Sequence, residues 1–530
     1  MKTSWSDMTS PRLRRALVAA GAASALAAAS CIAISPAQAD EPGLPGADLF
    51  VNPFSTTLEA GQSLTGQARD DAQLLGSIPS AEWFTKGTPA EVEAAARLYV
   101  DRATEAGAMP VLVAYNLPFR DCAQYSAGGA TNTAEYEAWI NGLAAGIGDR
   151  PATVILEPDG LGIIPWYTTF EGTSEWCKPG EANPATAATD RFAQLNHAVD
   201  ELGDLAATSV YLDGTHTGWL NVGDITDRLL KAGVQRADGF YLNASNYNFT
   251  TNLSAYGRWV SSCIAYVTKL APGGLGDCGN QYWNGGPATG WAGTAMDNYG
   301  QWSAGNAELS LNTDGVDSRY ALILGDVVPT THFVIDTSRN GLGPWDAPDG
   351  VYSDAQDWCN PPARGIGALP TTETGNPLID AYLWIKVPGE SDGECYRGTK
   401  GPLDPERGMK DPAAGEWFAA QARELVALAA PPLAPLDCHV NWNGPRAGET
   451  FAAKLRTEGA TGLPLSFVWS GDQQAVKAQN ATVSQAGHVV TVTANEHKPG
   501  KATEAVVLSV KGAAEQPWIF WLDGEACTSD

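Results

Sequence analysis

The chain has 530 residues, more than one ordinary domain holds, so two or more folded units are expected. Its 44% hydrophobic and 18% charged residues are typical of a globular protein rather than a disordered one. A formal net charge of −27 argues against a nucleic-acid partner, because phosphate binding requires clustered Lys and Arg. A neutral ligand is compatible with this acidity, which solubility alone explains equally well.

The first 39 residues have the pattern of an export signal. Arginines at positions 12, 14 and 15 precede residues 16–34, which are almost all small and apolar. Residues 37–39 (Ala-Gln-Ala) fit a small-residue cleavage site, which favours a secreted protein cleaved after Ala39 over a single membrane anchor. No other stretch approaches the roughly 20 apolar residues needed to span a bilayer, so no membrane partner is expected.

The cysteine count indicates a disulfide-bonded protein. Nine cysteines are present, and removing Cys31 with the signal leaves eight, an even number in an exported chain. Eight cysteines allow 105 pairings, of which sequence proximity suggests Cys122–Cys177, Cys263–Cys278, Cys359–Cys395 and Cys438–Cys527. Neither a Cys-x-x-Cys pair nor a His-Glu-x-x-His motif occurs, so neither a metal site nor a cofactor is expected.

Short apolar runs alternate with helix-like stretches up to about residue 430. Buried parallel strands are short, uninterrupted and rich in β-branched or aromatic residues, and six runs fit this description: 111–117, 153–156, 210–212, 240–242, 333–335 and 382–385. Residues 90–106 and 133–143 are predicted helices between them. This alternation predicts an α/β fold, either an α/β barrel or a doubly wound parallel sheet.

Several predicted strands end directly in polar residues. The carboxyl ends of parallel strands carry the active site in such folds, although Asp and Asn also open turns and cap helices. The capping explanation suits any one case better than the whole series, which comprises Glu157, Asp159, Asp213, Asn243, Asn246, Asp336, Lys386 and Glu390.

The pattern changes after a short linker. Residues 429–435 (Ala-Ala-Pro-Pro-Leu-Ala-Pro) are typical of a stiff connection, placed here at 429–437. Beyond it, residues 465–469, 481–492 and 505–510 alternate or run with β-branched residues and show no helical period. The sequence therefore predicts a large domain at 40–428 and a small all-β sandwich at 438–530.

Three aspartates follow apolar strands in distinctive settings: Asp121 in Arg-Asp-Cys, Asp159 in Glu-Pro-Asp, and Asp392 in Gly-Glu-Ser-Asp-Gly. Glycoside hydrolysis needs a protonated carboxyl at the leaving oxygen and a means of activating water on the opposite ring face. Neighbouring carboxylates raise one another's pKa, which keeps the acid protonated. Composition alone does not select these three from 60 acidic residues.

Ordered motifs over nearly 400 residues resemble glycoside hydrolase family 6, the cellobiohydrolase and endoglucanase family. Besides the three aspartate settings they are Leu-Phe-Val-Asn-Pro at 49–53, Tyr-Leu-Asp-Gly-Thr-His at 211–216, Leu-Asn-Ala-Ser-Asn-Tyr at 242–247, Ile-Asp-Thr-Ser-Arg-Asn-Gly at 335–341, Trp-Cys-Asn at 358–360 and Trp-Ile-Lys at 384–386. The resemblance implies a distorted seven-stranded parallel α/β barrel. It also implies a monomeric enzyme that cuts β-1,4-glucosidic bonds of cellulose or cello-oligosaccharides with inversion.

The resemblance assigns catalytic roles at matching positions. Asp159 matches the general acid. Asp121 matches the residue that raises the pKa of that acid and stabilises oxocarbenium-like charge. Asp392 is the candidate base, acting directly or through a chain of waters. Tyr115 and Ser126 lie where the family distorts the sugar and positions the water.

Other positions match residues that hold the sugar. Asp213 lines the same site or serves as a structural hydrogen-bonding carboxylate. Arg339 binds sugar hydroxyls or only holds its loop. Aromatic rings suit the faces of sugars, and the remaining expected substrate contacts are the platforms Trp219 and Trp358, the polar Lys386 and Glu390, and Asn243 and Asn246.

A long insertion between Asn246 and Asp336 bears on whether the enzyme cuts cellulose from its chain ends (exo attack) or within the chain (endo attack). It carries Cys263, Cys278, Trp283, Trp291 and Trp302, and loops of this length are usually functional or disordered. It is similar to insertions that roof a tunnel in exo-type members, so release of cellobiose from non-reducing chain ends is expected. The alternatives are an endo-β-1,4-glucanase and, from another class, a non-catalytic polysaccharide-binding protein.

Residues 438–530 resemble a family 2 carbohydrate-binding module. The resemblance rests on a Cys near each end, on Asn-Ala-Thr-Val-Ser-Gln-Ala-Gly at 480–487 and on the ending at 522–528. Gln479 and residues 495–497 replace expected surface tryptophans, which leaves Trp442, while Trp518 and Trp521 are expected in the core. The expectation is therefore that the module binds cellulose weakly or binds a different ligand.

Overall fold

The computed structural model describes residues 43–283, 295–436, 438–443, 450–456, 464–469, 473–479, 481–494, 506–511, 517–522 and 525–529. The predicted export signal, Trp291 and residues 495–497 lie outside the described residues, as do the side chains of Trp442 and Gln479. Among the residues described, no helix is both long and apolar enough to cross a membrane.

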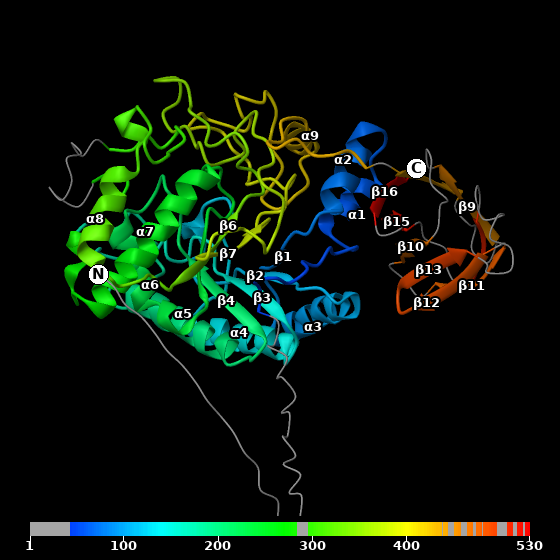
Figure 1. Ribbon diagram of the computed structural model, residues 1–530, viewed down its shortest axis with the longest axis horizontal. Helices are drawn as coiled ribbons and strands as arrows, with labels where there is room; N and C mark the ends of the chain where they lie inside the picture. The colour runs from blue at the N-terminus through cyan, green and yellow to red at the C-terminus, as the bar shows by residue number, and fades with distance from the viewer. Residues whose placement is uncertain are drawn as a thin grey trace, which may run out of the picture. The chain divides into compact units, whose positions relative to one another are not determined.

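A seven-stranded parallel sheet forms the centre of the large domain, which confirms the predicted fold class (Figure 1). The strands follow one another in chain order: β1 (Glu82–Phe84), β2 (Val111–Ala114), β3 (Ala152–Leu156), β4 (Thr208–Asp213), β5 (Gly239–Leu242), β6 (His332–Asp336) and β7 (Ile379–Leu383). The amide of Ala81 donates to the carbonyl of Trp384 at 2.9 Å, and the indole of Trp83 donates to that of Ile385 at 2.8 Å. These two bonds link the β1 and β7 edges of a distorted barrel.

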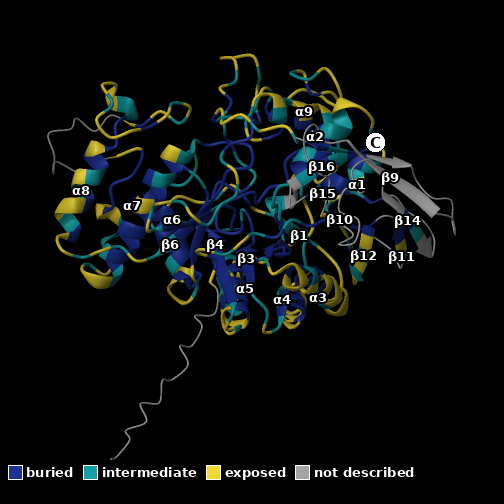
Figure 2. Cartoon of the chain, turned by 45° about the vertical axis from the view of Figure 1, so that its right-hand side comes forward, coloured by how far each residue is buried: buried dark blue, intermediate teal, exposed yellow. Residues whose placement is uncertain are grey.

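The strands separate two hydrophobic clusters, because successive side chains point to opposite faces of a sheet. One cluster fills the inside of the barrel and includes Val113, Ile155 and Tyr241. The other packs the outer face against the helices and includes Leu112, Val154 and Leu212. Figure 2 shows the strands buried in dark blue, with exposed yellow faces on the helices around them.

Nine helices are present in the described residues: α1 (Thr56–Gln62), α2 (Gln67–Gly76), α3 (Pro89–Ala106), α4 (Thr133–Ile147), α5 (Ala187–Gly203), α6 (Val222–Lys231), α7 (Thr250–Lys269), α8 (Asp314–Leu324) and α9 (Ala419–Ala427). α3 shows how local sequence defines them. Thr88 and Glu91 form a reciprocal capping box at its start, and Gly107 ends it at φ 68°. α4 packs closely on α3 because a side chain at Gly142 or Gly146 would meet the α3 backbone.

All four predicted disulfides are confirmed: Cys122–Cys177, Cys263–Cys278, Cys359–Cys395 and Cys438–Cys527. Cys122–Cys177 joins the loops after β2 and β3, and Cys359–Cys395 joins the loops after β6 and β7. Cys263–Cys278 lies within the insertion before β6, where it joins α7 to the segment that follows it. In Figure 1 the loops between β6 and α9, coloured yellow-green to orange, gather at the top of the view, away from α3 to α5. Disulfides therefore brace loops rather than the barrel itself.

The C-terminal residues form the predicted all-β module. Its nine described strands are β8 (Cys438–Asn443), β9 (Thr450–Arg456), β10 (Leu465–Val468), β11 (Gln474–Gln479), β12 (Ala481–Ala486), β13 (Val489–Ala494), β14 (Val506–Lys511), β15 (Phe520–Leu522) and β16 (Glu525–Ser529). Residues 481–492 belong to two strands, because Gly487, at φ 55°, turns the chain into a hairpin. Trp518 and Trp521, expected in the core, are only half-buried because each keeps one side toward the surface, whereas Trp469 is buried.

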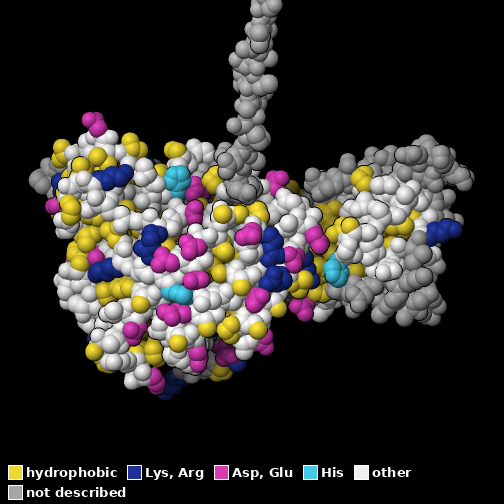
Figure 3. Space-filling model, turned by 90° about the horizontal axis from the view of Figure 1, so that it is seen from below, with side chains coloured by type: hydrophobic (Ala, Val, Ile, Leu, Met, Phe, Trp, Pro, Cys, Tyr) yellow, Lys and Arg dark blue, Asp and Glu magenta, His cyan; other side chains and the backbone are white. Residues whose placement is uncertain are grey.

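Charge is distributed over the surface rather than concentrated. On the face shown in Figure 3, Asp and Glu side chains (magenta) are scattered among Lys and Arg (dark blue). Since the chain carries 60 acidic and 33 basic residues, this mixture keeps like charges apart while the net charge stays negative.

Candidate active site

Four carboxylates gather at the carboxyl ends of the barrel strands. Asp159 follows β3 and Asp213 ends β4, while Asp121 and Asp392 lie in the loops after β2 and β7. Burial raises the pKa of Asp159 well above its ordinary value, and the negative charges of the other three raise it further, with Asp213 first among them. The structure thus brings the three predicted catalytic residues together, and the raised pKa of Asp159 favours the protonated form that a general acid needs.

The turn that carries Asp159 is held by its neighbour Glu157. Both residues have left-handed backbones, at φ 62° and 56°. The buried Glu157 carboxylate accepts the backbone N–H of Asn116 at 2.9 Å and that of Leu117 at 3.1 Å, so it ties the β3 turn to the β2 loop. Burial raises the pKa of Glu157 to about 7, although these N–H donors lower it.

Asp213 anchors the other side of the same turn. Its carboxylate accepts the backbone N–H groups of Leu161 and Gly162, each at 3.1 Å, and of Thr215 at 2.8 Å. The side chain is 3% exposed. Of the two roles predicted for Asp213, these contacts favour the structural one. Its charge adds a second effect by raising the pKa of Asp159.

Replacing Asp213 by Asn is expected to shift the alkaline limb of the kcat/KM profile toward lower pH by roughly one unit. The limb reports loss of the proton from Asp159, and removing a neighbouring negative charge lowers the pKa of that acid. The pH–rate profile of the variant, compared with that of wild type, measures the shift. An unchanged limb in a folded variant would contradict the electrostatic coupling.

Asp121 sits on a strained loop. Phe119, Asp121 and Cys122 all have left-handed backbones, at φ 58°, 55° and 47°, and such strain persists only where surrounding contacts impose it. The Asp121 carboxylate accepts the backbone N–H of Ser126 at 2.8 Å. Burial raises the pKa of Asp121. The half-buried Ser126 is therefore beside Asp121, where it was predicted to act.

Arg120 and a disulfide supply the contacts that impose this conformation. The Arg120 guanidinium donates to the carbonyls of Ser126 at 2.9 Å and Thr85 at 3.0 Å, and it also donates to that of Tyr115. It lies 4.4 Å from the centre of the Tyr115 ring, which is buried inside the barrel. Because Cys122 is bonded to Cys177, the loop is also fixed to the segment after β3.

Asp392 is held by a dense set of donors. Its carboxylate pairs with Arg339 at 2.9 Å, accepts the Tyr247 hydroxyl and the Asn360 N–H at 3.0 Å each, and lies 3.8 Å from Nζ of Lys386. Burial raises its pKa, but Arg339, Lys386 and the hydrogen bonds outweigh burial and leave the pKa below its ordinary value. A carboxylate so stabilised is a weak proton acceptor at ordinary pH.

The predicted sugar-binding residues divide into buried and accessible ones. Asn243 is buried, and its amide donates to the carbonyls of Asn246 and Asp336 at 3.2 and 2.9 Å. Arg339 is fully buried and donates to Ser245 and Asp392, so it holds loops, the second of its two predicted roles. Lys386 is buried and donates to the carbonyl of Ser391 at 3.1 Å, while Asn246 is half-buried.

Two tryptophans predicted as sugar platforms keep accessible rings. Trp358 is 36% exposed and lies 5.8 Å from the ring of Tyr125. Trp219 is half-buried and packs over Gly162, where a side chain would collide with the indole. His216 lies 5.7 Å from Trp219, and burial lowers its pKa to about 4, so this imidazole is neutral at pH 7.

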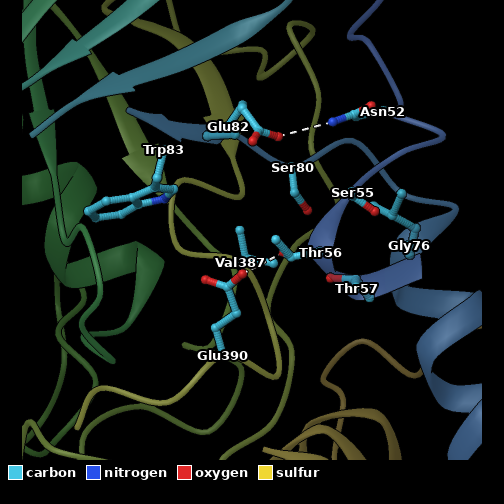
Figure 4. A pocket seen from close by; sticks show the side chains of 12 residues that line it. Asn52, Ser55, Thr56, Thr57, Gly76, Ser80, Glu82, Trp83, Val387 and Glu390 are labelled. Atoms are coloured by element: carbon cyan, nitrogen blue, oxygen red, sulfur yellow. Dashed lines mark hydrogen bonds between the residues drawn. The ribbon is translucent and has the colours of Figure 1, made fainter. Parts of the chain in front are cut away.

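A pocket beside β1 contains Glu390 and residues that the sequence did not single out (Figure 4). Glu390 accepts the hydroxyl of Thr56 at 2.6 Å, and Glu82 accepts the amide of Asn52 at 3.0 Å. Burial raises the pKa of Glu82 to about 7 and also raises that of Glu390. Hydroxyl, amide and carboxyl groups beside the Trp83 ring suit a polar, hydroxylated ligand.

Trp83 and Glu82 were missed because β1 is only three residues long. The available signal was the Glu-Trp-Phe run itself, an aromatic pair after a Pro-Ser-Ala turn. Trp83 is fixed by its bond to Ile385 and by edge contact with Tyr115 at 5.4 Å. The pocket therefore adjoins the barrel interior where Tyr115 lies.

Comparison with known proteins agrees with this geometry. A sequence model of glycosyl hydrolases family 6 matches residues 44–429. Endoglucanase A from Thermobispora bispora is 32% identical over 359 residues, which make up 68% of this chain and 57% of that protein. A probable 1,4-beta-D-glucan cellobiohydrolase C from Neosartorya fischeri is 28% identical over 412 residues, covering 73% of this chain and 78% of the relative.

A solved structure extends the comparison. The endoglucanase Cel6 from Mycobacterium tuberculosis, in complex with methyl-cellobiosyl-4-deoxy-4-thio-beta-D-cellobioside, is 30% identical, with a TM-score of 0.50. The match covers 74% of this chain and 98% of that one. Because the family model spans more than half of the chain, the chain belongs to glycosyl hydrolases family 6. It spans little more than half the length of the T. bispora relative.

Proposed function

We propose that the protein is a secreted, monomeric cellulase that hydrolyses β-1,4-glucosidic bonds with inversion. The observation that carries this proposal is the carboxylate cluster around Asp159, in which one acid is kept protonated beside three others. Asp159 protonates the leaving oxygen, and Asp121 stabilises the oxocarbenium-like charge or relays a proton from water. Tyr115 and Ser126 distort the sugar and position that water, and Asp392 acts as the base, directly or through a chain of waters. The names of the relatives, endoglucanase and cellobiohydrolase, support a cellulosic substrate.

We further propose exo attack that releases cellobiose from non-reducing ends. Support comes from contacts among the loops that follow β2, β6 and β7. The ring of Tyr125 lies 5.8 Å from Trp358 and 6.0 Å from Tyr396, and these three residues come from the three loops. Tyr299, in the long insertion, donates to Asp357 at 3.4 Å. Because these loops contact one another beside the carboxylates around Asp159, they favour an active site that is covered. A cellulose chain can enter a covered site only by its end.

The second candidate is an endo-β-1,4-glucanase, favoured by the names of the T. bispora and M. tuberculosis relatives. An exo enzyme is expected to release mainly cellobiose from phosphoric-acid-swollen cellulose, with little viscosity loss on soluble carboxymethyl cellulose. Chromatography of the products and viscometry measure both quantities. Rapid viscosity loss with mixed oligosaccharides would reject exo attack and establish the endo alternative.

We propose domain boundaries at 40–428 for the catalytic domain, 429–437 for the linker and 438–530 for a carbohydrate-binding module. The last barrel-domain helix, α9, ends at Ala427, and the family match ends at residue 429. The nine described strands that follow form a separate hydrophobic cluster with its own disulfide. This arrangement suits a module that keeps the enzyme near its polymer.

A further inference from the structure

The loops beside the active site form two braced halves that meet at Tyr125. Cys122–Cys177 joins the β2 loop, which carries Tyr125, to the segment after β3. Cys359–Cys395 joins the β6 loop to the β7 loop. We name the β2 side the first half and the β6 and β7 side the second half. Each half is covalently stapled, so relative movement must occur where the halves touch.

A buried ion pair stiffens the second half further. Arg397 and Asp404 are fully buried and joined by bonds of 2.9 and 2.8 Å. The Arg397 guanidinium also donates to the carbonyls of Ala355 and Gln356 at 3.0 and 3.1 Å, and it lies 4.6 Å from the centre of the Trp345 ring. The β6 and β7 loops therefore behave as one unit.

The Gln356 side chain joins this unit to the first half. Its Oε1 accepts the backbone N–H groups of Tyr396 at 3.0 Å and Arg397 at 2.6 Å. Because Oε1 must face those two donors, the amide nitrogen faces the opposite way and donates to the Tyr125 hydroxyl at 2.9 Å. Burial raises the pKa of Tyr125 to about 12, so its hydroxyl stays neutral at working pH. One amide thus connects all three loops.

The conformation of Gln356 indicates that its side chain is under constraint. The residue is 6% exposed, and its backbone lies at φ 47°, in a region that favours glycine. A buried glutamine in that region persists only where its contacts outweigh the backbone cost. On the other side of the contact, a side chain at Gly393 would collide with Tyr125, so the two halves touch directly there as well.

We propose that Gln356 is a positioning residue that sets the mode of attack, by locking the two halves together over the bound chain through Tyr125. This inference rests on the proposed exo function and assigns its control to a single amide. With the lock in place, a cellulose chain must enter by its end. Without it, the halves separate more often and the site accepts internal segments.

The test compares Gln356→Gly, Tyr125→Phe and the double variant with wild-type protein. Glycine removes the amide and suits the left-handed backbone, so it adds no backbone strain at that position, although the N–H groups of Tyr396 and Arg397 lose their acceptor. Both single variants are expected to raise the rate of viscosity loss on carboxymethyl cellulose, and to lower the ratio of soluble to insoluble reducing ends on filter paper. The expected change is roughly three- to tenfold for Tyr125→Phe, as for loss of one neutral hydrogen bond, and at least as large for Gln356→Gly, which removes three. The double variant should match the larger single effect.

Two controls separate locking from general damage. Tyr352→Phe removes a tyrosine hydroxyl that bonds to Glu406 within the second half, and it should behave as wild type. Turnover of cellotetraose, which is short enough to enter a closed site, should stay within about twofold in all variants.

Four outcomes would overturn the inference: wild-type ratios in Gln356→Gly, additive effects in the double variant, an equal change in Tyr352→Phe, or a parallel loss of cellotetraose turnover. Failure of the proposed exo function is seen separately, as rapid viscosity loss by the wild-type protein itself.

Discussion

Replacing Asp159 by Asn is expected to lower kcat on cellotetraose about 10³-fold, the usual loss when a general acid is removed. The natural leaving group is a sugar alkoxide, which needs a proton as the bond breaks. The asparagine side chain fits the same space but cannot supply that proton. Rates measured on purified protein, together with a thermal unfolding curve, determine whether activity falls without loss of the fold.

The leaving group makes the test specific for acid catalysis. With 2,4-dinitrophenyl cellobioside the departing phenolate needs no proton, so Asp159→Asn should lose less than about tenfold on this substrate. Asp149→Asn removes one carboxylate from an exposed turn after α4 and is the matched control, with full activity on both substrates. Equal losses by Asp159→Asn on both substrates would instead indicate damage to binding.

The same variant has a stability signature. The pKa of Asp159 is raised in the folded protein, so the folded state holds this proton to higher pH than the unfolded state does. The folded protein therefore loses stability as pH rises from the unfolded pKa toward the folded one. Asparagine cannot ionise and escapes this loss. Thermal unfolding of the variant relative to wild type should therefore improve from pH 5 to pH 8, while activity stays low.

The sequence placed the three candidate catalytic carboxylates after the correct strands because strand ends and motif order are local features. Asp121, Asp159 and Asp392 all lie in loops that follow the expected strands. The disulfides could be predicted because each of the eight cysteines pairs with its neighbour in chain order, although 105 pairings were possible. Both features depend on residue type and spacing, which the sequence displays directly.

Strand boundaries were less predictable because long-range partners decide them. Residues 111–117 form one apolar run, yet β2 ends at Ala114. The N–H groups of Asn116 and Leu117 bind the Glu157 carboxylate, 40 or more positions away, instead of a neighbouring strand. Gln356 shows the same limit more sharply. One glutamine carries no motif, and its role depends on Tyr125 and Tyr396, which meet only in the fold.

Replacing Arg339 by Met is expected to lower the free energy of unfolding at pH 7 by about 3–5 kcal/mol, because it removes the closer of the two cations beside the buried Asp392 carboxylate and leaves only Lys386, at 3.8 Å. Asp392→Asn strands the arginine and should cost a similar amount. Replacing both by Met and Leu removes both charges and should recover most of the stability, but no activity. Thermal unfolding of the full chain measures all three variants.

The pH dependence of these differences identifies the ion pair as their cause. In wild type the pKa of Asp392 is lowered, so the stabilisation is complete above the unfolded pKa of about 3.9 and is lost as pH falls through the folded value. In Arg339→Met, burial, which raises this pKa, loses its largest opposing charge, so the pKa of Asp392 rises and the variant gains less of this stabilisation as pH rises. The difference in free energy of unfolding between wild type and variant should therefore widen from pH 3 to pH 7. The centre of the Tyr247 ring lies 4.4 Å from the Arg339 guanidinium. A difference that does not change with pH would point to lost packing against this ring instead of a lost ion pair.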